Sequence, residues 1–128
     1  MKIKKVDFIN RQLLKDNPNW LFLFGDNLEE KGYGGQAKEM RGEPNAIGIP
    51  TKVKPDMSED SFFNDNDFNE VKKIYDFDFD LINELMMGKY DMIVIPSSGL
   101  GTGLAKLNIN APKIFEYLNM KLNELEEK

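Results

Sequence analysis

The chain has 128 residues, of which 41% are hydrophobic and 30% charged. A chain of this length can bury one hydrophobic core but not two, so we expect a single domain over residues 1–128. Its net charge of −5 argues against an extended nucleic-acid surface, and a bound anion would be held mainly by backbone N–H groups. The absence of cysteine and histidine excludes thiol chemistry, disulfides, imidazole bases and metal sites built on those ligands.

Membrane and export signals are missing from the sequence. No apolar segment approaches the length of a membrane span, and none follows the basic residues 1–5 as it would in a signal peptide. We therefore expect a cytoplasmic protein with no membrane partner.

Three elements are expected in the first part of the chain. Residues 3–9 contain β-branched and aromatic side chains and predict an edge strand, and residues 11–15 predict a helical turn. The unbroken apolar run 20–24 is too short for an independent helix and lies between turn residues. It is typical of a strand buried on both faces, as in a parallel sheet.

The first candidate site follows this strand directly. Residues 25–27 (Gly-Asp-Asn) end the strand, and the glycine-rich loop 32–35 leads into helix formers at 36–41. Open α/β sheets bind ligands where a strand ends in such a loop and a helix begins. Glycines let backbone N–H groups approach a phosphate closely, although the same glycines could serve only to reverse the chain.

The middle of the chain predicts structural elements. The apolar run 46–49 predicts a short strand, after which Lys52 would lie on a loop. The polar stretch 55–66 predicts an exposed loop, in which Phe62 and Phe63 are more often packing anchors than ligand-stacking aromatics.

A long helix is expected next. Residues 65–76 resemble a calcium loop, but Glu70 stands where the sharp turn requires glycine, so we predict no metal site. Asp67 and Glu70 instead predict a capping box that opens a helix over residues 67–87. The alternating stretch 76–80 would continue this helix.

A second glycine loop follows a second buried strand, residues 92–95. The loop 96–105 (PSSGLGTGLA) fits neither the dinucleotide fingerprint nor the P-loop, and Ser98 has neither the flanking glycines of a nucleophile elbow nor a histidine to activate it. Its small residues could surround a diphosphate and a ribose, or form a plain flexible turn. A final helix over residues 111–127, capped by Asn110, completes the chain.

The order of these motifs resembles the macrodomain family, whose members are ADP-ribose-binding α/β/α modules. Residues 25–27 look like the family's strand tip ending in asparagine, and residues 32–37 are similar to its first ligand loop. Residues 99–104 look like its second, phosphate-wrapping loop, especially in the branch of antitoxins that reverse ADP-ribosylation of DNA. The resemblance covers residues 20–118. It implies an α/β fold with three layers, α/β/α, and a mixed central sheet.

The resemblance also implies a ligand: ADP-ribose or a related NAD-derived nucleotide, free or attached to a macromolecule, with no further cofactor. Asn27 would contact the distal ribose, and Asp26 is the candidate catalytic carboxylate. The residues expected to bind the ligand are Gly25, Asp26, Asn27, Gly32, Tyr33, Gly34, Gly35, Gln36, Ala37, Ser97, Ser98, Gly99, Leu100, Gly101, Thr102 and Gly103.

The chain departs from the hydrolytic members of that branch. Tyr33, Gly34 and Gly35 stand where the branch has a catalytic lysine, and Lys106 or Asn108 where it has an acid after the second loop. The leading hypothesis is therefore nucleotide binding. One alternative is an ADP-ribosyl hydrolase or ADP-ribose 1″-phosphate phosphatase in which Asp26 activates a water. Another is a protein-interaction module without a ligand.

Overall fold

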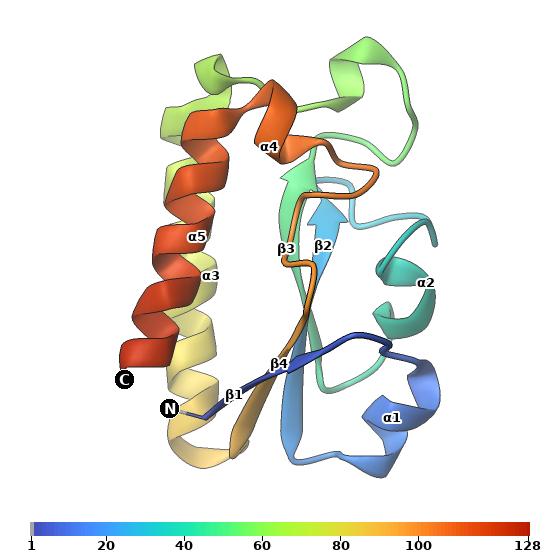
Figure 1. The fold of residues 1–128 in the computed structure, drawn as a ribbon, viewed down its shortest axis with the longest axis vertical. Coiled ribbons are helices and arrows are strands. Elements are labelled where there is room, and N and C mark those ends of the chain that lie inside the picture. Colours follow the sequence, from blue (N-terminus) through green and yellow to red (C-terminus); the bar gives the residue numbers. More distant parts are fainter. Residues whose placement is uncertain (1) are drawn as a thin grey trace.

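The computed structural model describes residues 2–128. The chain forms a four-stranded sheet with helices on both faces (Figure 1). The strands are β1 (Ile3–Val6), β2 (Trp20–Asn27), β3 (Ala46–Lys52) and β4 (Met92–Pro96). They lie in the order β1-β4-β2-β3, and each neighbouring pair is parallel. The α/β class is confirmed.

The expectation of a mixed sheet is wrong for the residues that the structure describes. Successive strands are joined through helices: α1 (Arg11–Asp16) lies between β1 and β2, α2 (Ala37–Met40) between β2 and β3, and α3 (Phe68–Gly88) between β3 and β4. Each crossover brings the chain back to the edge of the sheet at which the preceding strand began, so all strands run in one direction. The chain ends in α4 (Leu107–Asn110) and α5 (Pro112–Glu127).

The two long helices occur where they were predicted, but their caps differ. The capping box joins Asn64 to Asp67 and opens a 3₁₀ turn at Asp65–Asp67, just before α3. Asn110 is the last residue of α4 and does not cap α5. Asp65 takes over this role, because its carboxylate accepts a hydrogen bond from Lys113 N–H at 3.0 Å. A cap supplied from a distant turn has no local sequence signature.

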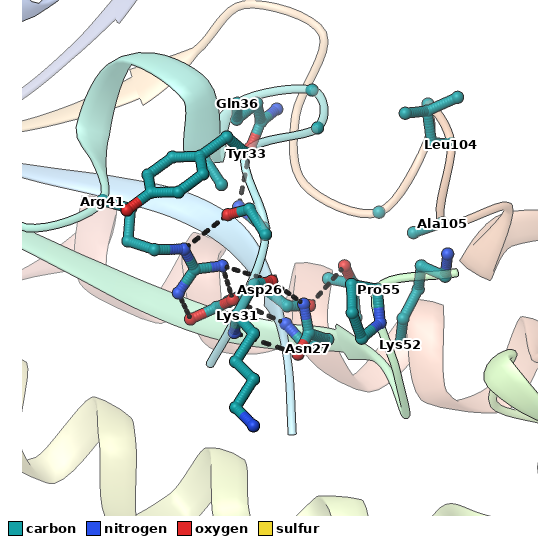
Figure 2. Close-up of a pocket in the computed structure, with 18 residues that line it drawn as sticks. Asp26, Asn27, Lys31, Tyr33, Gln36, Arg41, Lys52, Pro55, Leu104 and Ala105 are labelled. Carbon is teal, nitrogen blue, oxygen red and sulfur yellow. Dashed lines mark hydrogen bonds and ion pairs between the residues drawn. The ribbon is translucent and has the colours of Figure 1, made fainter. Parts of the chain in front are cut away.

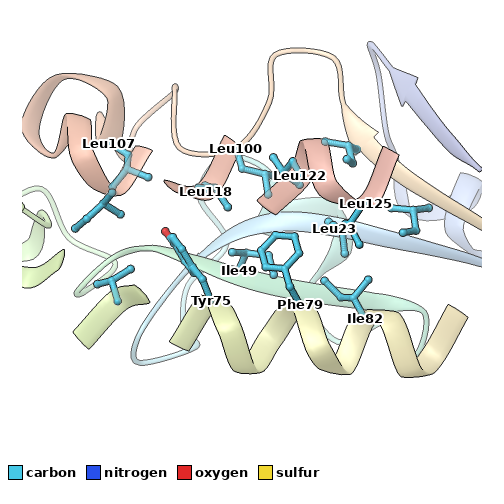
Figure 3. Packing of buried hydrophobic residues seen from close by; sticks show 14 of the residues in the cluster. Leu23, Ile49, Tyr75, Phe79, Ile82, Leu100, Leu107, Leu118, Leu122 and Leu125 are labelled. Carbon is cyan, nitrogen blue, oxygen red and sulfur yellow. The ribbon is translucent and has the colours of Figure 1, made fainter. Parts of the chain in front are cut away.

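Apolar side chains form one cluster on each face of the sheet. The larger cluster lies between the sheet and the pair α3 and α5, and Figure 3 shows these helices enclosing Leu23 and Ile49. The smaller cluster joins the sheet to α1 and α2 and contains Phe22 and Phe24. Alternate side chains of β2 thus enter opposite clusters, which confirms that β2 is buried on both faces. No helix within residues 2–128 is both long and apolar enough to cross a membrane.

The crossovers determine where a crevice can open. The chain leaves β2 toward α2 on one face and leaves β4 toward α4 and α5 on the other. Register pairing between β2 and β4 ends at Phe22 and Val94, so the carboxyl ends of the two strands separate. Ligands of open α/β sheets bind at such a switch point.

Candidate functional site

A pocket lies at this carboxyl edge and is lined by both glycine loops. Its walls come from residues 25–27, 31–37 and 103–105, together with the tip of β3. The cavity volume is about 190 Å³. That is smaller than the roughly 300–1,000 Å³ typical of sites that enclose a drug-sized molecule. A nucleotide would therefore separate the two loops or extend beyond the cavity.

The predicted site residues divide into two groups. Those from Gly25 to Ala37, with Gly101 and Gly103, line the pocket. The remaining members of the second loop, which do not line it, are Ser97, Ser98, Gly99, Leu100 and Thr102. Leu100 belongs to the core, where it is 1% exposed and packs near α5 (Figure 3).

Asp26 forms a buried ion pair at the strand tip. Its carboxylate is bound by both terminal nitrogens of Arg41, Nη1 at 3.1 Å from Oδ2 and Nη2 on Oδ1, and Asn27 N–H donates to Oδ1 at 2.8 Å (Figure 2). Asp26 is 8% exposed, and the Arg41 side chain 15%. Both carboxylate oxygens are therefore occupied by donors.

Arg41 also holds the first glycine loop in place. Its Nε donates to the Gly32 carbonyl at 2.7 Å and its Nη2 to the Lys31 carbonyl at 3.2 Å. The Asn27 amide adds a bond to the same Lys31 carbonyl at 2.8 Å. The strand tip and the loop thus form one hydrogen-bonded unit around the Asp26–Arg41 pair.

Gln36 connects the first loop to β2 and to the second loop. Its Oε1 accepts from Gly25 N–H at 2.7 Å, and its Nε2 donates to the Gly99 carbonyl at 3.0 Å. Beyond Phe22, β2 has no register partner in β4, so the Gln36 amide bridges the gap between the separating strands.

Two glycines are required by close packing at the site. A Cβ on Gly48 of β3 would lie 2.8 Å from the Asp26 Cβ. A Cβ on Gly101 would lie 2.9 Å from the Leu107 Cβ, and Gly101 has a φ of +85°, which disfavours other residues. Gly103, by contrast, has open space where a Cβ would be and no positive φ.

Leu104 and Ala105 belong to the predicted second loop but were not among the expected ligand-binding residues. The pocket residues outside the predicted strand tip and both predicted loops are Lys31, Arg41, Thr51, Lys52 and Pro55. The sequence did contain a signal for Arg41, because this cation follows the first glycine loop within two helical turns. Lys52 was expected on a loop, but it is the last residue of β3 and is 7% exposed. Leu104 and Ala105 lie on the opposite side of the cavity from Tyr33 and Arg41 (Figure 2).

Fold and pocket together define an α/β protein with a candidate ligand site at the carboxyl edge of a parallel sheet. The chain belongs to a family of unknown function (DUF7831), whose model matches residues 4–121. The match includes both glycine loops. No curated protein and no solved structure matches the chain.

Proposed function

We propose that this protein binds ADP-ribose or a related NAD-derived nucleotide in a macrodomain-like α/β/α fold. One observation carries the proposal: two glycine loops that follow strands far apart in the sequence, β2 and β4, line a single pocket at the switch point of the sheet. Helices on both faces of the sheet also support a three-layer arrangement.

Backbone groups would hold the charged part of the ligand. Gly34, Gly35, Gly101 and Gly103 line the pocket and have no side chains that would keep a diphosphate away from the main chain. The Asn27 amide donates one N–H to Lys31, which leaves its second N–H for a hydroxyl of the distal ribose.

Exposed apolar side chains flank this polar floor. Tyr33 of the first loop is 67% exposed and Leu104 of the second is 57% exposed. Large apolar groups at the rim of a polar pocket can cover the ring systems of a nucleotide. Both loops would then contribute one backbone surface and one apolar contact to the same ligand.

The ion pair of Asp26 favours binding over hydrolysis. A general base needs a free lone pair aimed at a water, and the Arg41 guanidinium and Asn27 N–H already take three of the roughly four acceptor positions of the Asp26 carboxylate. We therefore propose nucleotide binding without rapid turnover. Hydrolysis through Asp26 remains the alternative and requires that the Arg41 pair open.

Isothermal titration calorimetry with ADP-ribose, using Gly103→Glu, tests the proposal. The glutamate adds bulk and negative charge in the pocket without backbone strain, so binding should be lost while the melting temperature stays near that of the wild type. Gly88→Glu is the matched control, because Gly88 also has open space around a Cβ and ends α3 at the opposite edge of the sheet. Full affinity in Gly103→Glu would refute the assigned pocket.

A ligand screen widens this test. Thermal shifts with ADP-ribose, NAD, AMP, ADP-ribose 1″-phosphate and cyclic ADP-ribose isomers would rank the nucleotides. If none of them raises the melting temperature or gives a heat of binding, nucleotide binding is the wrong function and the ligand-free interaction module becomes the better hypothesis.

A further inference from the structure

Lys52 places a buried positive charge in the wall of the pocket. It ends β3 in register with Asn27 of β2, it lines the cavity, and it is 7% exposed. The loop after β3 surrounds its ammonium: Nζ donates to the Asp56 carbonyl at 2.5 Å, lies 3.6 Å from Met57 Sδ and lies 4.8 Å from the centre of the Phe62 ring.

No carboxylate within residues 2–128 forms an ion pair with Lys52. The other pocket cation that is largely buried, Arg41, is paired with Asp26. Asp56, the neighbouring acid, directs its carboxylate to Ser58 and Ser61 instead, and these hydrogen bonds lower its pKa to about 2.

The surroundings of Lys52 satisfy its hydrogen-bonding capacity only in part. An ammonium has three N–H donors, and here one carbonyl, one weakly accepting sulfur and the Phe62 ring face it. Burial lowers the pKa of Lys52, which the charge of Asp56 opposes. Buried charges in proteins are normally paired, so an ammonium in a pocket wall that has no carboxylate partner is suited to an incoming anion.

We infer that Lys52 is a specificity residue that selects ligands carrying an anionic group, a phosphate or a carboxylate, on the sugar at the β2–β3 end of the pocket. This inference rests on the proposed function. If the distal ribose lies against Asn27, the substituent on its C1″ carbon lies beside the register partner of Asn27, which is Lys52.

Lys52 is expected to raise the affinity for some ligands and to lower it for others. An anion on C1″ gains a charge-assisted hydrogen bond from Lys52, whereas the cationic nicotinamide of NAD⁺ meets a like charge there. A hydrogen bond to a charged group contributes roughly tenfold to hundredfold in affinity. Plain ADP-ribose should therefore bind more weakly than its C1″ anions and more tightly than NAD⁺.

Calorimetry on the full chain measures this preference. The ligands are ADP-ribose, ADP-ribose 1″-phosphate and ADP-ribonate, an open-chain acid whose C1″ is the carboxylate carbon and which separates the two anion types. The wild type should bind at least one anion about tenfold or more tightly than ADP-ribose. The ratio should fall to about one in Lys52→Gln and persist in Lys52→Arg.

Lys54→Gln is the matched control, because Lys54 lies on the loop that follows Lys52 but pairs with Asp60 and does not line the pocket. It should keep the wild-type ratio. Equal wild-type affinities for ADP-ribose and both anions would overturn the role of Lys52 and leave nucleotide binding intact, as would an unchanged ratio in Lys52→Gln. Absence of binding to all three ligands would overturn both proposals.

Discussion

Replacing Arg41 by methionine should destabilise the protein and loosen the first glycine loop. The substitution removes the bidentate bond to Asp26 and the bonds to the Gly32 and Lys31 carbonyls, and leaves the Asp26 carboxylate buried without its partner. Breaking a fully buried ion pair costs about 3–5 kcal/mol. Water can reach this pair from the pocket, so we expect about 2–3 kcal/mol, or a melting temperature lower by roughly 8–12 °C.

Urea unfolding of a double-mutant cycle measures this coupling. Asp26→Asn and Arg41→Met each leave one partner alone, whereas the double variant removes both charges. The double variant should therefore be more stable than the sum of the single losses predicts, by about 1.5–3 kcal/mol. Losses that add to within about 0.5 kcal/mol would show that the pair contributes little and would refute the reasoning.

Three further predictions concern packing, pH and turnover. Gly48→Ala should cost about 2 kcal/mol in urea unfolding, because its Cβ would meet Asp26, whereas the control Gly88→Ala should be neutral or stabilising. Burial and the charge of Glu30 raise the pKa of Asp78 to about 6, so the folded state holds this proton more tightly than the unfolded chain. Stability should therefore fall as pH rises from about 4 to about 6, and Asp78→Asn should gain about 1 kcal/mol at pH 7 and flatten that slope; an unchanged slope would contradict the assignment. Incubation with ADP-ribosylated protein, ADP-ribosylated DNA and ADP-ribose 1″-phosphate should release product slowly or not at all, and rapid release that disappears in Asp26→Ala would establish hydrolysis instead.

Periodicity and turn residues were sufficient to predict the elements around the site. The apolar run at β2, the helical spacing of α3 and α5 and the position of both glycine loops were all read from local patterns, and the structure has them at those places. These features depend on neighbours within a few residues. Gly34 and Gly101, which belong to the two glycine loops, line one pocket at the carboxyl edge of the sheet.

Features made by distant partners could not be predicted in this way. The pairing of Asp26 with Arg41 depends on the path of the loop between them, and the cap that Asp65 gives to α5 joins residues 48 positions apart. The burial of Lys52 has no local sequence signal, because it depends on how the following loop folds over its ammonium, which contacts Met57 Sδ and the Phe62 ring. The parallel sheet, in contrast, was indicated by the apolar run of β2, and the expectation of a mixed sheet came from the family resemblance alone.

The amide of Gln36 makes the energetics of the two glycine loops interdependent. It accepts from Gly25 with one atom and donates to Gly99 with another, a pair of roles that a glutamate could not fill because a carboxylate has no donor. A substitution that shifts either loop changes the geometry of both bonds. Effects of mutations in the two loops on ligand affinity should therefore fail to add, even though the loops lie more than sixty residues apart.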